Sequence, residues 1–347
     1  MATLKDVAAL AKVHPSTVSR VIRGVENIPV TEETRQKILD AVAQLNYEPD
    51  QRARALRLGK TETIGLIIPD ISNPFFAEIA KSIEQESYKI GYNLLMCVTN
   101  ENQEKEIKFV HNLLNRGVDG LILAPVQDRY DHLIELKKKN YPFVLVDRCF
   151  EEFETNAVIS DNEAAAFEAM EHLVIYGHHR IAFLSGRPTI YTIRKRLEGF
   201  KKALEVFELD DAPDLISRGG FTVEDGYNGT LAFLDLPHPP SAIMVSGNRI
   251  TFGAIKAIVE RGLTIPEDIS LIGFTDSIVS PYLITPLTTI NHPLQDMGKR
   301  AFELLLDHIN STDFLPLSKI IVKTNFHIRQ STMSIKDVED RKVPLHA

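Results

Sequence analysis

The sequence predicts an α/β protein that begins with a small all-α segment. Two observations lead to this fold class. Over residues 1–60 apolar side chains recur at helical spacing, whereas from residue 63 onward short continuous apolar runs alternate with longer amphipathic stretches. Strands of that kind form parallel sheets that helices cover on both faces. Because the alternation occurs in two successive sets, we expect two doubly wound subdomains.

The first set has four predicted strands and the second has three. These strands are residues 64–68, 94–98, 121–124, 143–146, 181–184, 242–245 and 270–272. The helices between and after them are predicted at residues 75–90, 104–115, 130–139, 163–176, 192–205, 223–234 and 249–261. Ligands of such sheets bind beyond the carboxyl ends of the strands, so two facing subdomains would share one cleft.

The composition excludes several classes of protein. The chain has 347 residues, of which 44% are hydrophobic and 25% charged, so it is neither collagen-like nor disordered. No apolar run approaches the ~18–20 residues of a membrane helix, and the N-terminal residues do not resemble a signal peptide. Cys97 and Cys149 lie inside apolar runs, which favours two buried free thiols in a reducing compartment. We therefore expect a cytoplasmic protein that does not contact a membrane.

The charge is distributed unevenly along the chain. Its net value is −8, yet residues 1–60 hold 10 basic and 7 acidic side chains, and the remaining residues hold 29 and 40. A basic N-terminal segment on an acidic body indicates a polyanionic partner for that segment only.

Three short helices are predicted in the first 60 residues. Thr3 and Asp6 have the spacing of a helix start, and Pro15 suits the first position of a second helix that reaches about Arg23 and ends at Gly24. A third helix starts at Thr31. The side chains expected inside are Leu4, Val7, Ala8, Leu10, Ala11, Val18, Val21, Ile22, Ile38, Leu39, Val42 and Leu45. Two short helices joined by a tight turn and braced by a third form a helix-turn-helix.

The outer face of the second helix has the side chains that a DNA groove requires. Arg20 can reach both acceptors of a guanine, and Ser16 and Thr17 can contact bases or phosphates. From the spacing alone, a three-helix bundle with a solvated polar face is the alternative.

The residues also support a resemblance to a known family. The segments TLKDVAALAKVHPSTVSRVIRG, VTEETRQKILDAVAQLNYEPD and RARALRLGKTETIGLIIPDISNPFF resemble the lactose/galactose repressor family of bacterial transcription regulators. The likeness continues through DGLIL, LVDR, HLVIYGHHRIAFLSG, RLEGF, PLTTI and RQST, and thus over nearly the whole chain. It implies a homodimeric regulator, usually a repressor, that binds a near-palindromic site on double-stranded DNA.

The resemblance also implies which residues contact DNA. They are Pro15, Ser16 and Arg20 in the major groove, Thr17 and Ser19 on phosphate, and further Tyr47, Arg52, Ala53 and Leu56. Residues 50–58 resemble the hinge helix of the family, whose leucine, here Leu56, enters the minor groove and bends the duplex. The alternative for this segment is an ordinary linker in which Ala53 and Leu56 pack locally.

Two positions of the predicted turn depart from the family pattern. His14 stands where a serine is usual, so we expect a weaker helix cap. Lys12 stands where a glycine is usual, so we expect a backbone there that needs no positive φ.

The remaining chain resembles an effector domain like the periplasmic sugar-binding proteins. The implied effector-binding residues are Asn73, Phe75, Asp147, Arg196, Phe221, Asn248, Thr275 and Asp276. Alternatives are a plain salt bridge between Asp147 and Arg196 and a core position for Phe221. Asn248 and Thr275 stand where the family commonly has aspartate, so a typical hexose is not the expected ligand. The resemblance implies that a small molecule, a sugar or a sugar derivative, binds between the subdomains and controls operator affinity.

The expected divisions follow from the same resemblance. Residues 1–49 form the DNA-binding domain, 50–61 the hinge helix and linker, 62–332 the effector domain and 333–347 a flexible tail without the leucine repeat of a tetramer. Crossings are expected near residues 160–163, 291–293 and 322–325. They give one subdomain of about 62–161 with 292–322, and another of about 162–291 with 323–332.

Nothing in the sequence indicates catalysis. The phosphate-binding, dinucleotide-binding, zinc-protease and serine-hydrolase motifs are missing, and His172, His178 and His179 lack the spacing of metal ligands. We expect no cofactor and no metal. Two other functions compete with a regulator: a solute-binding protein, and a cytosolic sugar-acting enzyme with an appended DNA-binding head.

Overall fold

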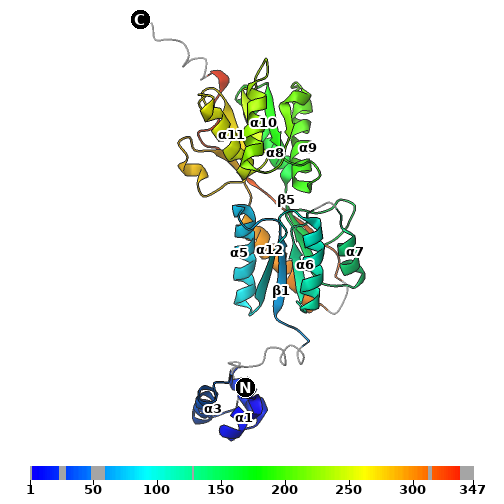
Figure 1. Cartoon of the computed structure of the whole chain (residues 1–347), viewed down its shortest axis with the longest axis vertical. Helices are drawn as coiled ribbons and strands as arrows, with labels where there is room; N and C mark the ends of the chain where they lie inside the picture. Colours follow the sequence, from blue (N-terminus) through cyan, green and yellow to red (C-terminus); the bar gives the residue numbers. More distant parts are fainter. Residues whose placement is uncertain (1, 23–28, 48–58, 127–128, 312–314, 337–347) are drawn as a thin grey trace. The chain divides into compact units, whose positions relative to one another are not determined.

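The computed structural model describes residues 2–22, 29–47, 59–126, 129–311 and 315–336. They belong to two compact units, Met1–Glu62 and Thr63–Ala347, which we describe separately (Figure 1). Gly24, the candidate hinge residues Arg52, Ala53 and Leu56, and most of the predicted tail lie outside the described residues.

The first unit, which we call the head, is the predicted helix-turn-helix. It contains α1 (Leu4–Leu10), α2 (Pro15–Ile22) and α3 (Glu32–Gln44). Thr3 caps α1, because its hydroxyl accepts the Asp6 N–H while the Asp6 carboxylate accepts the Thr3 N–H at 2.8 Å. Val7, Val18 and Ile38, one from each helix, are fully buried and form the centre of a small core.

Two side chains that were expected in this core lie on the surface. Leu10 and Leu39 are each 44% exposed. Each helical residue is rotated by about 100° from the one before it. Leu39 therefore lies beside Ile38 on the flank of α3, and Leu10 lies on the flank of α1. The core of so small a unit covers only one narrow stripe of each helix.

The prediction for Lys12 is wrong, because its φ is +55°. The Val13 N–H donates to the Ala8 carbonyl and the Lys12 N–H donates to the Ala9 carbonyl, at 3.0 and 3.3 Å. This pair of bonds is the Schellman closure of a helix, and it places the residue after the C-cap in the left-handed region. This helix closure requires a positive φ at the residue after the C-cap, whatever its type, and here Lys12 adopts it.

Lys12→Gly is expected to stabilise the head by about 0.5–1 kcal/mol, because glycine adopts a positive φ without the steric cost that a Cβ brings. Amide hydrogen exchange of α1 and α2 in the full chain should slow several-fold. Asn46→Gly is the matched control, since Asn46 closes α3 at φ +45° and asparagine tolerates this region. Equal effects of the two substitutions would contradict the explanation.

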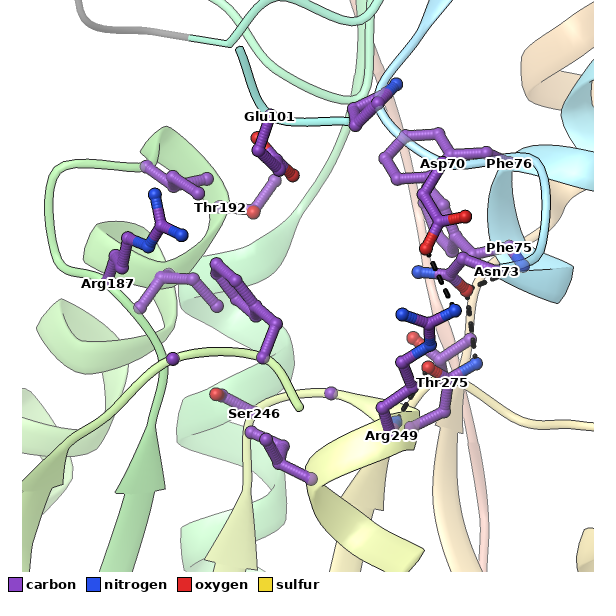
Figure 2. Close-up of a pocket in the computed structure, with 18 of the residues that line it drawn as sticks. Asp70, Asn73, Phe75, Phe76, Glu101, Arg187, Thr192, Ser246, Arg249 and Thr275 are labelled. Atoms are coloured by element: carbon purple, nitrogen blue, oxygen red, sulfur yellow. Dashed lines mark hydrogen bonds and ion pairs between the residues drawn. The ribbon is translucent and has the colours of Figure 1, made fainter. Parts of the chain in front are cut away.

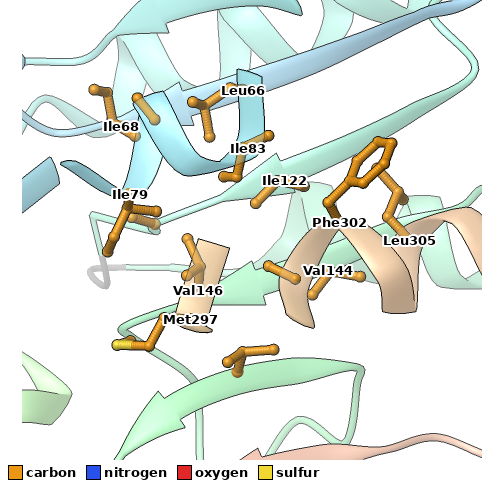
Figure 3. Close-up of a cluster of buried hydrophobic side chains, with 14 of the residues drawn as sticks. Leu66, Ile68, Ile79, Ile83, Ile122, Val144, Val146, Met297, Phe302 and Leu305 are labelled. Atoms are coloured by element: carbon orange, nitrogen blue, oxygen red, sulfur yellow. The ribbon is translucent and has the colours of Figure 1, made fainter. Parts of the chain in front are cut away.

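The first sheet of the second unit has six parallel strands in the order β11-β5-β4-β3-β1-β2. The strands are β1 (Thr63–Ile68), β2 (Asn93–Val98), β3 (Gly120–Leu123), β4 (Phe143–Val146), β5 (Ala157–Ser160) and β11 (Lys319–Val322). Helices α5 (Pro74–Lys89) and α12 (Leu294–Asn310) cover one face, and α6 (Gln103–Asn115) and α7 (Asp131–Lys138) cover the other. Figure 3 shows Phe302 and Leu305 of α12 next to Ile122 and Val144, and Met297 next to Val146.

The second sheet has the order β12-β10-β9-β8-β6-β7, in which β12 alone is antiparallel to its neighbour. Its strands are β6 (Ile181–Ser185), β7 (Ile216–Arg218), β8 (Ala242–Val245), β9 (Ser270–Phe274), β10 (Thr288–Asn291) and β12 (Asn325–His327). Helices α8 (Asn162–Ile175) and α9 (Tyr191–Val206) cover one face, and α10 (Val223–Leu234) and α11 (Asn248–Glu260) the other.

Helices α10 and α11 meet backbone to backbone. A Cβ on Gly253 would overlap the Val223 carbonyl oxygen, and one on Gly226 would overlap the Ile250 carbonyl oxygen. Glycine at both positions therefore permits the close approach of two helices whose first turns reach the end of the sheet.

The chain passes between the two sheets three times. It leaves β5 for α8 between residues 160 and 162, leaves β10 for α12 between residues 291 and 294, and leaves β11 for β12 between residues 322 and 325.

The sequence did not predict every element of the two sheets. The missed elements are helix α12 and strands β5, β7, β10, β11 and β12. Several of them are edge strands or very short, so they lack a continuous apolar run.

Neither cysteine forms a disulfide bond. Cys149 is buried, as expected, but Cys97 is only half-buried, because β2 is the edge strand of its sheet. Among the described residues no helix is long and apolar enough to cross a membrane.

Candidate functional site

The outer face of α2 in the head holds the candidate DNA contacts. Ser16 and Arg20 are exposed, while Pro15, Thr17 and Ser19 are half-buried. Arg20 forms no ion pair with another described residue. Tyr47 follows α3 and packs against the core of the head, so its ring is partly covered. An exposed guanidinium beside small hydroxyl side chains is suited to reading base edges.

The imidazole of His14 caps α2. Its Nδ1 accepts the Ser16 N–H at 3.3 Å and lies 2.7 Å from the Ser16 Oγ. The ring thus replaces the serine hydroxyl that is usual at this position, although the bond to the backbone is long.

A cavity of about 650 Å³ lies between the two sheets of the second unit, where loops after β1, β4, β6, β8 and β9 converge (Figure 2). Seven of the eight residues predicted to contact an effector line it. These are Asn73, Phe75, Asp147, Arg196, Phe221, Asn248 and Thr275. The carboxyl ends of strands from both sheets therefore contribute to one cavity.

Asp276 is not among the residues that line the cavity. Its carboxylate accepts from Arg329 Nη2 at 2.7 Å and lies 2.9 Å from His327 Nδ1. Thr275, its neighbour, has a φ of +79° and faces the cavity. A change of direction at this residue turns Asp276 toward β12 and away from the cavity.

Asp147 is a buried carboxylate in the cavity wall. Its Oδ1 has no hydrogen-bond partner among the described residues, and its Oδ2 lies 3.7 Å from Arg148 Nε. Burial raises the pKa of Asp147 to about 6, although the charges of Arg148 and Arg196 oppose the shift. The cavity wall thus contains a buried carboxylate oxygen that has no donor among the described residues.

Arg196 is held by neutral groups, and no ion pair joins it to Asp147. Its Nε donates to Asn162 Oδ1 at 2.7 Å and its Nη1 to the Ser246 carbonyl at 2.5 Å. The guanidinium also lies 4.5 Å from the centre of the Phe274 ring. Burial lowers the pKa of Arg196 to about 10, so the group stays charged at neutral pH.

The ring of Phe221 belongs to the cavity and to none of the buried core clusters. It is half-buried and lies on Gly186, where an added Cβ would overlap it. An aromatic face at this place can stack on the apolar side of a ligand.

Side chains from opposite sheets meet at the edge of the cavity. Arg249, at the start of α11, pairs with Asp70 at 2.9 Å and donates to Ser72 Oγ at 2.5 Å. Beside it, Asn248 Nδ2 donates to Asn73 Oδ1 at 3.3 Å (Figure 2). We call these contacts the clasp; they join the loop after β1 to α11.

Several residues of the cavity were missed in the sequence. Arg148 forms a two-bonded ion pair with Glu101 at 2.7 and 2.9 Å, and Arg187 extends toward the cavity without an ion pair to another described residue. The other missed residues include Asp70, Thr192, Ser246 and Arg249. Asp70, Glu101 and Ser246 come just after predicted strands, which was the available signal.

The histidines considered for metal binding have other contacts. His172 Nε2 lies 2.9 Å from Thr332 Oγ1, and His178 Nε2 lies 3.1 Å from the Met333 carbonyl oxygen. In the part of the chain that the structure describes, no group of three potential ligands could hold a metal ion.

Comparison with known families gives two matches that together span most of the chain. Residues 3–50 match the model of bacterial regulatory proteins of the lacI family, and residues 61–330 match that of periplasmic binding proteins and the sugar-binding domain of the LacI family. The chain belongs to the LacI family.

Individual LacI-family proteins are similar over almost their whole length. Catabolite control protein A of Priestia megaterium is 35% identical over 95% of this chain and 99% of its own. The repressor PurR of Aliivibrio salmonicida is 36% identical over 89% and 92%. A structure of the lac repressor dimer bound to operator and an anti-inducer matches 96% of this chain and 99% of its own, with a TM-score of 0.84 and 28% identity. The head is thus the DNA-binding domain of a LacI-family regulator, and the second unit is its ligand-binding domain.

Proposed function

We propose that this protein is a cytoplasmic repressor that binds a near-palindromic operator as a homodimer. Its affinity for the operator falls or rises when a small molecule binds in the cavity. The observation that carries the effector site is the cavity itself, which is lined by the ring of Phe221 and by Asp147, whose Oδ1 has no donor among the described residues. It supports a ligand-binding site, and similar proteins include the ribose operon repressor and the repressor PurR. We infer no cofactor.

For DNA, we propose that Pro15, Ser16 and Arg20 read bases and that Thr17 and Ser19 contact phosphate. Exposure of Ser16 and Arg20 on one face of α2 supports these roles. Tyr47 and the hinge residues Arg52, Ala53 and Leu56 complete the proposed interface.

Arg20→Ala is expected to cost roughly 1–3 kcal/mol at one G·C pair of each half-site and to relax specificity there, because the two guanine acceptors lose a bidentate donor. Thr17→Ala, the control on the same helix, should weaken specific and random DNA about equally. Binding to operators with single base-pair changes measures both. If Arg20→Ala weakened every sequence equally, the groove role would be contradicted.

For the effector, we propose a sugar derivative. Asp147 would accept hydrogen bonds from its hydroxyl groups, and Asn248 would donate hydrogen bonds to them or accept from them. Phe221 would stack on its apolar face. Two cations of the cavity, Arg187 and Arg196, form no ion pair with a carboxylate among the described residues, which supports an acidic group on the ligand. Asn73, Phe75 and Thr275 complete the proposed site, whereas we propose no ligand contact for Asp276.

The two subdomains of this proposal are residues 62–161 with 292–322 and residues 162–291 with 323–332. A ligand that contacts both subdomains favours one relative orientation of them. The difference in its affinity for the two orientations is the free energy that can change DNA affinity.

Exposed apolar side chains support the homodimer, since Ile278, Tyr282 and Ile284 are 87%, 83% and 105% exposed. Sedimentation should find a dimer; a monomer on DNA would contradict it.

Operator affinity measured against a panel of ligands tests the proposal. The panel contains neutral sugars, sugar phosphates, sugar acids and nucleosides, and turnover of each is followed alongside. We expect an acidic sugar derivative to change operator affinity about 5- to 150-fold, without turnover. Turnover would instead support the sugar-acting enzyme, and a response to neutral sugars alone would contradict the acidic class.

A further inference from the structure

The contact between His14 and Ser16 fixes the direction of a hydrogen bond on the DNA-binding face. The Ser16 N–H lies 3.3 Å from His14 Nδ1, and a backbone N–H can only donate. An Nδ1 that accepts this N–H cannot also carry a proton, so the geometry corresponds to the tautomer with the proton on Nε2. The Ser16 Oγ lies 2.7 Å from the same Nδ1. Since Nδ1 has no proton to give, the serine hydroxyl is the donor of this short bond.

The donation changes what Ser16 can offer to another molecule. A serine hydroxyl has one proton and two acceptor lone pairs. With its proton directed to His14, the Oγ presents only acceptors to its surroundings. A free serine, in contrast, can rotate and serve as donor or acceptor, which is why serine by itself discriminates poorly between bases.

The major groove distinguishes bases by the same property. Adenine presents the N6 amino group and cytosine the N4 amino group, both donors, whereas guanine and thymine present O6 and O4, both acceptors. We propose that His14 makes Ser16 an acceptor-only reader, so that the protein prefers adenine or cytosine over guanine or thymine at the base that Ser16 contacts. This inference rests on the proposed role of Ser16 in the groove.

The local backbone favours the arrangement. Pro15 is the first residue of α2, and a proline disfavours helical backbone at the residue before it. His14 is thereby held outside the helix at the N-cap, with Ser16 two residues on. In this account His14 is a positioning residue, since it acts on the base only through Ser16.

The preference can be measured by selecting operators with the full-length protein from a library randomised in both half-sites. Ser16→Ala identifies the contacted position as the one at which the amino-to-keto preference is lost. His14→Gly removes the acceptor yet keeps a residue that starts helices well. We expect it to lower the amino-to-keto ratio at that position at least 5-fold while the other positions keep their preferences. His14→Asn, whose Oδ1 can accept from both groups, should restore the ratio.

Each outcome supports or overturns the inference. If Ser16→Ala changes no position, Ser16 does not read a base, and both the proposed contact and the inference fail. If Ser16→Ala acts but His14→Gly leaves the ratio intact, the contact stands and the role of His14 fails. A keto preference of the wild type at that position also overturns it.

A measurement that needs no DNA provides an independent check. In protein labelled with ¹⁵N-histidine, the His14 signal, assigned by its loss in His14→Asn, should report a neutral ring protonated at Nε2. Protonation at Nδ1 would overturn the inference even if His14→Gly failed to fold.

Discussion

Replacing Asp147 with asparagine is expected to stabilise the ligand-free protein and to weaken effector binding. The carboxylate is buried, and its pKa is raised to about 6 because burial disfavours the charge. Relative to an ordinary value of 3.8, the ionised group costs on the order of 3 kcal/mol at neutral pH. Asparagine has nearly the same shape without the charge, so the urea midpoint at pH 7.5 should rise.

The pH dependence identifies the cause. In the folded wild type the carboxyl takes up its proton as the pH falls through about 6, whereas in the unfolded chain it does so only near 3.8. The wild type therefore gains stability relative to Asp147→Asn between about pH 6 and pH 4, and the difference between the two proteins should shrink over that range. A difference that does not depend on pH would contradict the electrostatic explanation.

Effector binding should change in the opposite direction. Loss of a charged acceptor that meets a ligand hydroxyl is worth about 1.5–3 kcal/mol, or roughly 10- to 100-fold in affinity. Asp276→Asn is the matched control, because this carboxylate is paired with Arg329 and does not line the cavity. It should destabilise the protein and leave effector affinity unchanged. Calorimetry with the effector found in the screen measures both variants.

Gly253→Ala is expected to destabilise the protein by about 3 kcal/mol, at the upper end of the range for overpacking. The added methyl group would overlap the Val223 carbonyl oxygen and approach the backbone of Tyr227, and backbone atoms cannot rotate away as a side chain can. Helix α11 must then move away from α10. Both helices start at the cavity, so effector affinity should fall together with stability.

Gly219→Ala is the matched control in the loop before α10. Its Cβ would meet only the Cβ of Asp225 at 3.5 Å, an ordinary contact. Urea unfolding should find it within about 0.5 kcal/mol of the wild type. If Gly253→Ala were equally mild, the two helices would have room that the structure does not show.

The regular elements of the fold were predictable where they bury a continuous apolar surface. The predicted runs at residues 143–146 and 242–245 coincide with β4 and β8, because both strands are covered on two faces. Strand β11 was not predicted, since it lies at the edge of its sheet and only its last residue, Val322, is buried. The hydrophobic pattern of the sequence thus indicates a strand only where the strand is buried, and edge strands bury too few of their residues.

The candidate site was predictable in its location but not in its pairings. Seven predicted residues line the cavity because residues after parallel strands meet at one edge. Asp276 turns away after a left-handed residue, and Arg196 takes Asn162 and Ser246 as partners instead of Asp147. These choices depend on backbone direction and on contacts between distant residues. Lys12 is a further example, since its φ is imposed by the closure of α1.

The return of the chain to its first sheet has a consequence for synthesis on the ribosome. Proteins emerge N-terminus first, and domains commonly begin to fold as they emerge. The first sheet begins at Thr63, yet Met297, Phe302 and Leu305 of α12, which cover one of its faces, are synthesised much later. Its last strand in the sequence ends at Val322. Until then Ile64, Leu66 and Ile122 lack these covering partners. The second sheet is likewise incomplete until β12, residues 325–327, has been synthesised. Both sheets are therefore completed only after residue 327 has left the ribosome, and a nascent chain stalled before residue 294 would expose the apolar face that α12 covers in the finished protein.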